Sequence, residues 1–140
     1  MDKLTPEERS RHMSKIRSKD SKPEMVVRRF LHAQGIRFRL HDKALPGKPD
    51  LKLPKYHAVI FVHGCFWHGH QDCHIYQMPK SRVSFWNNKI TTNMARDEKR
   101  IVTLREMGWR VFILWECDLK PTKRQPILES LLRDIKRKHD

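Results

Sequence analysis

Four residues have the types and the spacing that bind zinc. Cys65, His70 and Cys73 are separated by four and two residues, and Cys117 follows further along the chain. Three thiolates and one imidazole form the tetrahedral donor set that structural zinc selects. The loop that carries them has little apolar content, so a bound metal would help it to fold. The sequence therefore predicts a structural zinc site.

Ordinary buried thiols and surface histidines are the alternative to this zinc site. Zinc is favoured because Cys65 and Cys117 each follow an expected strand, and two parallel strands of one sheet would bring these ends together. The fourth ligand is the least determined, because three imidazoles lie near the thiols in sequence: His68, His70 and His74.

Asp50 and His63 are expected at neighbouring strand ends. Asp50 begins a strand after Pro49 and His63 ends the next strand, and in an antiparallel pair such ends lie close together. A carboxylate there is a suitable oxygen ligand for Mg²⁺. Hydrolysis of a phosphodiester needs a hard cation at the phosphoryl oxygen and a base that takes a proton from water. For Asp50 alone, a turn-forming role after proline is the more common interpretation.

Asp97 is the only charged member of an apolar stripe on an expected helix. The stripe has alternating spacings of four and three: Ile90, Met94, Asp97, Ile101 and Leu104. A buried carboxylate is costly unless a partner compensates it, and histidine is a natural partner. Pairing with a neighbouring arginine at the edge of the stripe is an equally good interpretation.

Three aromatic residues lie where they could contact bases. Phe66 and Trp67 follow Cys65 in a loop that is otherwise polar, and Trp86 lies at the start of an expected long helix. Aromatic rings beside basic residues can stack on bases or enter between them. Most aromatic residues are core residues, but a metal-held loop favours exposure of Phe66 and Trp67. Met13, on a basic N-terminal helix, could act in the same way.

The elements that must position these residues follow the order α-α-β-β-β-α-β-α. Helices are expected over residues 5–18, 21–35, 84–107 and 127–135, and strands over 37–41, 50–53, 57–63 and 109–116, the last two of them buried. This order predicts an α/β fold with a mixed sheet flanked by helices. Ser21 and Glu24 form a capping box for the second helix, which is the safer interpretation of Glu24 from position alone.

Size, charge and cysteine content limit the class of protein. The 140 residues suit a single domain, with a basic arm over 1–20 and a C-terminal helix over 126–140. The formal net charge of +14 attracts polyanions, most commonly nucleic acid; a merely basic surface is the alternative. Three cysteines without an export signal argue against a disulfide framework. No stretch is apolar enough to cross a bilayer, so we expect a cytoplasmic protein without a membrane partner.

Several motifs together resemble a known family. LPGKPD, FVHGCFWHGH, PKSRVSFWNNKI, NMARDEKR and GWRVFILWEC closely resemble the very short patch repair endonucleases, over residues 11–117. The resemblance implies a restriction-endonuclease-like fold, a variant of the PD-(D/E)xK nucleases. It also implies a bacterial, nucleoid-associated enzyme that nicks one strand 5′ of the thymine in a T·G mismatch. Such mismatches arise when 5-methylcytosine deaminates. A T·G pair is weakly stacked, so insertion there costs less than in matched duplex.

The resemblance also implies roles for individual residues. Asp50 would bind Mg²⁺ with the backbone carbonyl of Val62, Glu24 would act through metal-bound waters, and His63 would replace the lysine of the parent nucleases. His68 would be the general base, oriented by Asp97. Four residues match the zinc ligands: Cys65, His70, Cys73 and Cys117. Four residues would enter the duplex beside the mismatch: Phe66, Trp67, Trp86 and, from the minor groove, Met13.

Two departures from some members of that family stand in this chain. Val62 replaces a threonine, and the loop between His70 and Cys73 is one residue longer. We expect a monomer, with mismatch-repair proteins as candidate partners. A restriction-like nuclease on matched DNA and a non-catalytic, zinc-stabilised DNA-binding protein are the alternatives to this function.

Overall fold

The computed structural model describes residues 21–71, 73 and 80–137. Its helices are α2 (Lys22–Ala33), α3 (Val83–Glu106) and α4 (Arg124–Lys136), and its strands are β1 (Arg39–Leu40), β2 (Leu51–Leu53), β3 (Ala58–His63) and β4 (Arg110–Trp115). Two short 3₁₀ helices, η1 (Pro54–Tyr56) and η2 (Glu116–Leu119), follow β2 and β4. The expected helix over residues 5–18, with Met13, lies outside the described residues. Among the described helices, none is both long and apolar enough to cross a membrane.

The strands form one mixed sheet in the order β1-β2-β3-β4. The β1–β2 and β2–β3 pairs are antiparallel, and β3 and β4 are parallel, from Ala58 opposite Arg110 to His63 opposite Trp115. The parallel pair confirms the expectation that Cys65 and Cys117 leave the sheet at the same end. The expectation that β4 is fully buried is wrong, because only Leu114 is buried. In the described part of the sheet, β4 is an edge strand with a neighbour on one side only.

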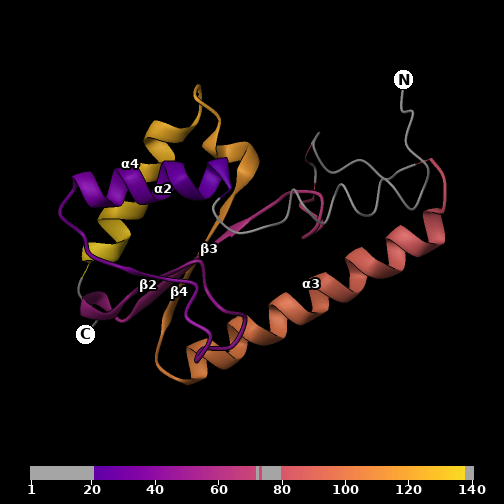
Figure 1. The fold of residues 1–140 in the computed structure, drawn as a ribbon, viewed down its shortest axis with the longest axis horizontal. Coiled ribbons are helices and arrows are strands. Elements are labelled where there is room, and N and C mark those ends of the chain that lie inside the picture. The colour runs from indigo at the N-terminus through magenta and orange to yellow at the C-terminus, as the bar shows by residue number, and fades with distance from the viewer. Residues whose placement is uncertain (1–20, 72, 74–79, 138–140) are drawn as a thin grey trace.

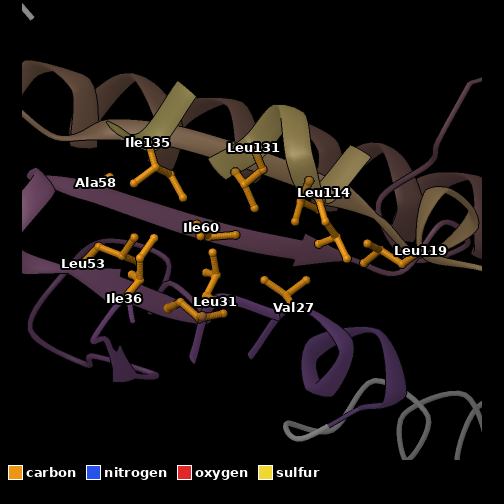
Figure 2. Packing of buried hydrophobic residues seen from close by; sticks show 12 residues of the cluster. Val27, Leu31, Ile36, Leu53, Ala58, Ile60, Leu114, Leu119, Leu131 and Ile135 are labelled. Carbon is orange, nitrogen blue, oxygen red and sulfur yellow. The ribbon is translucent and has the colours of Figure 1, made fainter. Parts of the chain in front are cut away.

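Helices cover both faces of the sheet, as the order of elements predicted. Ala58 and Ile60 of β3 face a core built with α2 and α4, to which Val27, Leu31, Leu131 and Ile135 contribute (Figure 2). Val59 and Phe61 alternate with them and pack with Leu104 of α3 on the opposite face. Accordingly, α2 and α4 lie together on one side of the strands and α3 on the other (Figure 1). Because successive side chains of β3 point to opposite faces of the sheet, this strand packs against α2 and α4 on one face and against α3 on the other.

The ends of these elements follow local sequence. The Ser21 hydroxyl accepts the N–H of Glu24 at the start of α2, and Gly35 (φ +79°) follows its end, as the capping residues predicted. Helix α4 begins at Arg124, before the expected position 126, because proline is tolerated in a first turn. Strand β1 is shorter than the expected 37–41, because His41 has the left-handed φ of +46°. At this turn the N–H of His41 donates to the carbonyl oxygen of Asp50.

Candidate active site

Asp50 directly precedes β2, and β3 holds its side chain. The N–H of Val62 donates to Asp50 Oδ2 at 2.7 Å, so the carboxylate is fixed against the neighbouring strand. Asp50 and His63 line the same cavity, as the antiparallel pairing of their strands predicted. The cavity has a volume of about 1110 Å³, which leaves room for a substrate above the strand ends.

Two further side chains join Asp50. Glu24, buried on α2, accepts a hydrogen bond at Oε2 from Arg28 at 2.9 Å, and His41 Nε2 lies 3.1 Å from the same oxygen. His41 Nε2 is also 3.8 Å from Asp50 Oδ1. The backbone N–H of Glu24 is therefore capped by the Ser21 hydroxyl, while its carboxylate belongs to this cluster. Sequence reasoning missed His41, and only its place beside the LPGKPD turn could have suggested it.

The cluster has a donor set that suits a divalent cation. One ligand atom each of Glu24, His41 and Asp50 lies within 4.8 Å of the other two. The pKa of Asp50 is raised to about 7, mainly by burial and also by the nearby charge of Glu24, although the hydrogen bond from the Val62 N–H lowers it. A cation between the two carboxylates would remove this repulsion. The residues present therefore fit a hard metal ion.

His63, His68 and Asp97 form a second cluster in the same cavity. The ring of His63 stacks on that of His68 at a centroid distance of 3.8 Å, and His68 Nδ1 is hydrogen-bonded to Asp97 Oδ2. Histidine is thus the partner of Asp97, which is one of the two interpretations that the stripe on α3 left open. Burial alone would raise the pKa of Asp97, but the hydrogen bond and charge of His68 lower it overall. Asp97 therefore remains a carboxylate that can orient His68.

His63 is neutral at neutral pH. Its pKa is lowered to about 3, mainly by burial and also by the charge of the neighbouring His68, although the charge of Asp97 raises it. The parent nucleases carry a positively charged lysine at this position. The neutral imidazole of His63 cannot supply that charge. In the structure, the ring of His63 stacks on that of His68 and holds it in place.

The four expected zinc ligands come together at the ends of β3 and β4. One ligand atom from each of Cys65, His70, Cys73 and Cys117 lies within 4.8 Å of the others, and Cys117 Sγ is 3.4 Å from His70 Nδ1. None of the three cysteines forms a disulfide. Burial raises the pKa of Cys65 and of Cys117, so the thiols are neutral until a metal replaces their protons. The donor set fits zinc, and His70 is the imidazole that lies with the three thiols among the described residues, which do not include His74.

Two residues of the β4 end connect the zinc-type cluster to the histidines. Trp115 stacks on His70 at 4.0 Å and meets His63 edge-on at 5.1 Å. Glu116 accepts the N–H of Cys65 at 3.0 Å. Both residues were missed from the sequence, although they directly precede Cys117. They make the position of His68 depend on the metal loop.

The expectation that Phe66 and Trp67 are exposed is wrong. Phe66, Trp67 and Trp86 have exposed fractions of 8, 3 and 1% and form a buried cluster with Ile90. Their rings meet edge-on at centroid distances of 5.4–6.0 Å. The metal loop lies against α3 and not in solvent, because Asn93 of α3 donates to the carbonyl of Trp67 at 3.1 Å. Met13 lies outside the described residues.

Basic side chains surround the cavity and the aromatic cluster. Lys89 Nζ lies 5.1 Å from the ring centroid of Trp67, and five basic residues line the cavity: Lys22, Lys48, Arg100, Lys120 and Arg124. Cations of this kind contact backbone phosphates, which positions a nucleic acid without reading its sequence.

Comparison with known proteins agrees with this chemistry. Residues 1–75 match the family model described as DNA mismatch endonuclease Vsr. The type II nicking enzyme V.XorIIP of Xanthomonas oryzae pv. oryzae is 49% identical over 134 residues, 96% of each chain. The DNA mismatch endonuclease Vsr of Escherichia coli K12 is 45% identical over 112 residues, which cover 80% of this chain and 71% of that one. The protein is therefore a strand-nicking DNA endonuclease. It belongs to the DNA mismatch endonuclease Vsr family.

Proposed function

We propose that the protein nicks one strand of duplex DNA 5′ of the thymine in a T·G mismatch, in a Mg²⁺-dependent reaction. One cavity holds both the carboxylate cluster of Asp50 and the hydrogen-bonded pair of His68 and Asp97, and this observation carries the proposal. A cation site and a base are what metal-assisted phosphodiester hydrolysis requires. Relatives named as a mismatch endonuclease and as a nicking enzyme support the substrate and the single cut. The biological source of the mismatch would be deaminated 5-methylcytosine.

Asp50 and the backbone carbonyl of Val62 would hold the cation, with Glu24 beside them. When bound, Mg²⁺ polarises a phosphoryl oxygen and offsets the negative charge that develops there. The Val62 N–H keeps the Asp50 carboxylate in place at 2.7 Å. Arg28 neutralises part of the charge of Glu24, which leaves Asp50 as the stronger ligand of the two.

His68 would take the proton of the attacking water. Its Nδ1 is engaged by Asp97, so Nε2 is the nitrogen that acts as the base, and the carboxylate stabilises the imidazolium that forms. His63, neutral and stacked on His68, keeps the ring from turning. This pair is the reason to assign catalysis, and not only DNA binding, to the cavity.

We also propose a restriction-endonuclease-like fold, formed by one domain over residues 1–140, with zinc as the structural metal. The mixed four-stranded sheet with helices on both faces supports this proposal. The Cys₃His cluster, with ligands from two strand ends, supports zinc.

Mismatch recognition would require the three packed aromatic rings to separate and enter the duplex. Opening a base step costs a few kcal/mol, and a mismatched step is cheaper to open. Changing Phe66 and Trp67 together to leucine keeps apolar volume in the cluster but removes the flat rings. We expect this variant to lose about tenfold or more of its preference for T·G over matched duplex, because tenfold corresponds to about 1.4 kcal/mol.

The control for this variant is Trp109→Leu, whose ring stacks on His57 and does not line the cavity. Competition binding with T·G and matched duplexes measures the preference, and thermal unfolding checks the fold. Affinity for matched DNA should stay within about threefold, since phosphate contacts dominate it. An unchanged preference in the leucine variant would exclude the wedge role.

The proposed function is tested with an end-labelled duplex that contains one T·G pair, beside the same duplex with T·A. We expect one Mg²⁺-dependent nick 5′ of the mismatched thymine, at least about tenfold faster than cleavage of the matched duplex, and no nick with a chelator. Equal cleavage of the two duplexes would indicate a restriction-like nuclease. Binding without cleavage, across several flanking sequences, would indicate a DNA-binding protein.

A further inference from the structure

His41 is the member of the carboxylate cluster to which no role has been assigned. Its side chain is 12% exposed and lines the cavity with Glu24 and Asp50. Nε2 lies 3.1 Å from Glu24 Oε2 and 3.8 Å from Asp50 Oδ1. The ring therefore directs one nitrogen to the space between the two carboxylates.

The backbone conformation that places His41 here is energetically unfavourable. Its φ of +46° is in the left-handed region, which a residue with a side chain adopts rarely and often at functional sites. The N–H of His41 donates to the carbonyl oxygen of Asp50 at 3.2 Å. The same turn thus fixes both His41 and Asp50, and it preorganises their side chains.

These separations suit two ligands of one cation. With bonds of about 2.1 Å, two ligands at right angles lie about 3 Å apart, and wider angles bring them to about 4 Å. The 3.8 Å between His41 Nε2 and Asp50 Oδ1 lies in that interval. Glu24 Oε2 is already hydrogen-bonded to Arg28 at 2.9 Å, which weakens it as a direct ligand. His41 is therefore better placed than Glu24 to complete the inner set of ligands.

We propose that His41 Nε2 binds the cation of the active site directly, beside Asp50, and that this nitrogen makes the site bind Mn²⁺ more tightly than Mg²⁺. The proposal rests on the proposed function, in which Asp50 is a metal ligand. Imidazole suits transition metals, whereas Mg²⁺ prefers oxygen ligands. Mg²⁺ would still serve where it is the more available ion, because availability as well as affinity decides which metal is bound.

The experiment measures metal binding and not turnover. Zinc-loaded full-length protein is titrated with Mn²⁺, the free ion is followed by electron paramagnetic resonance, and Mg²⁺ affinity is obtained by competition. Pulsed resonance detects a nitrogen ligand of the bound Mn²⁺. We expect the wild type to bind Mn²⁺ about tenfold or more tightly than Mg²⁺, with a nitrogen coupling.

His41→Gln replaces the nitrogen ligand with a hard amide oxygen. It should weaken Mn²⁺ binding about tenfold, remove the nitrogen coupling and change Mg²⁺ affinity by less than about threefold. The matched control is His57→Gln, a histidine with a similar φ of +53° that does not line the cavity; it should behave as the wild type. His41→Asn, which tolerates the left-handed backbone better, serves if the glutamine variant does not fold.

Two results would overturn the role of His41. One is a nitrogen coupling and Mn²⁺ affinity that persist in His41→Gln. The other is tighter binding of both ions in that variant, which would make the imidazole a counter-ion that the cation displaces. Asp50→Asn separates this failure from that of the proposed function. If Asp50→Asn binds Mn²⁺ as tightly as the wild type, the proposed cation site is wrong, and so is the role of His41 as its ligand.

Discussion

Changing His68 to alanine is expected to lower the rate of nicking about 10²–10⁴-fold, which is the usual contribution of a general base. The ring lies between a buried, neutral His63 and the ionised Asp97, so it is held in one orientation and one tautomer. Its loss removes the proton acceptor but no phosphate contact. Single-turnover nicking of a T·G duplex measures the rate, and the affinity for that duplex should change by less than about threefold.

Asp97→Asn tests the hydrogen-bonded pair of His68 and Asp97 by changing its carboxylate. The amide can still hold the ring by a hydrogen bond but does not stabilise the imidazolium, so an intermediate loss of about 10–10³-fold is expected. His57→Ala is the matched control, because that histidine stacks on Trp109 and is not part of the cluster of His63, His68 and Asp97. A His68→Ala protein that nicks at more than about a tenth of the wild-type rate would remove His68 as the base.

That Asp97 needs a partner could be predicted because it depends on local periodicity, although the choice between histidine and arginine stayed open. A charge in the apolar stripe of a 24-residue helix needs a partner wherever the helix packs. The stripe itself was only partly right, since Met94 is 37% exposed while Asn93 is buried. The convergence of Cys65 and Cys117 was predictable for a similar reason, because it required only that β3 and β4 be parallel neighbours.

His41 and the burial of the aromatic rings depend on tertiary contacts that leave no local signal. His41 continues the alternating pattern of residues 37–41, and nothing in that pattern shows that its backbone turns to a positive φ. The metal loop packs on α3 because Gly69 (φ +62°) has no side chain, and a Cβ there would lie 2.5 Å from Met94 Sδ. Such a close approach cannot be inferred from the composition of the loop, which is polar.

Cys117→Ser is expected to abolish zinc binding, destabilise the fold and disable the enzyme together. Serine does not replace a thiolate in a Cys₃His set, and the free energy of structural zinc binding is folding free energy. A loss of about 3 kcal/mol would lower the melting temperature by about 10 °C in a domain of this size. Nicking should fall about 10²-fold or more, because His68 lies in the sequence between two of the proposed zinc ligands, Cys65 and His70, and would lose its position against Asp97.

Metal analysis, thermal unfolding and single-turnover nicking on the same preparation separate these effects. His70→Ala should match Cys117→Ser in all three, whereas His74→Ala should keep one zinc per chain, because His70 is the imidazole that lies with the thiols. Zinc retained by His70→Ala and lost by His74→Ala would reassign the fourth ligand. Full activity in a zinc-free Cys117→Ser protein would contradict the dependence of activity on zinc, since Trp115 and Glu116 would then hold His68 in place without a metal.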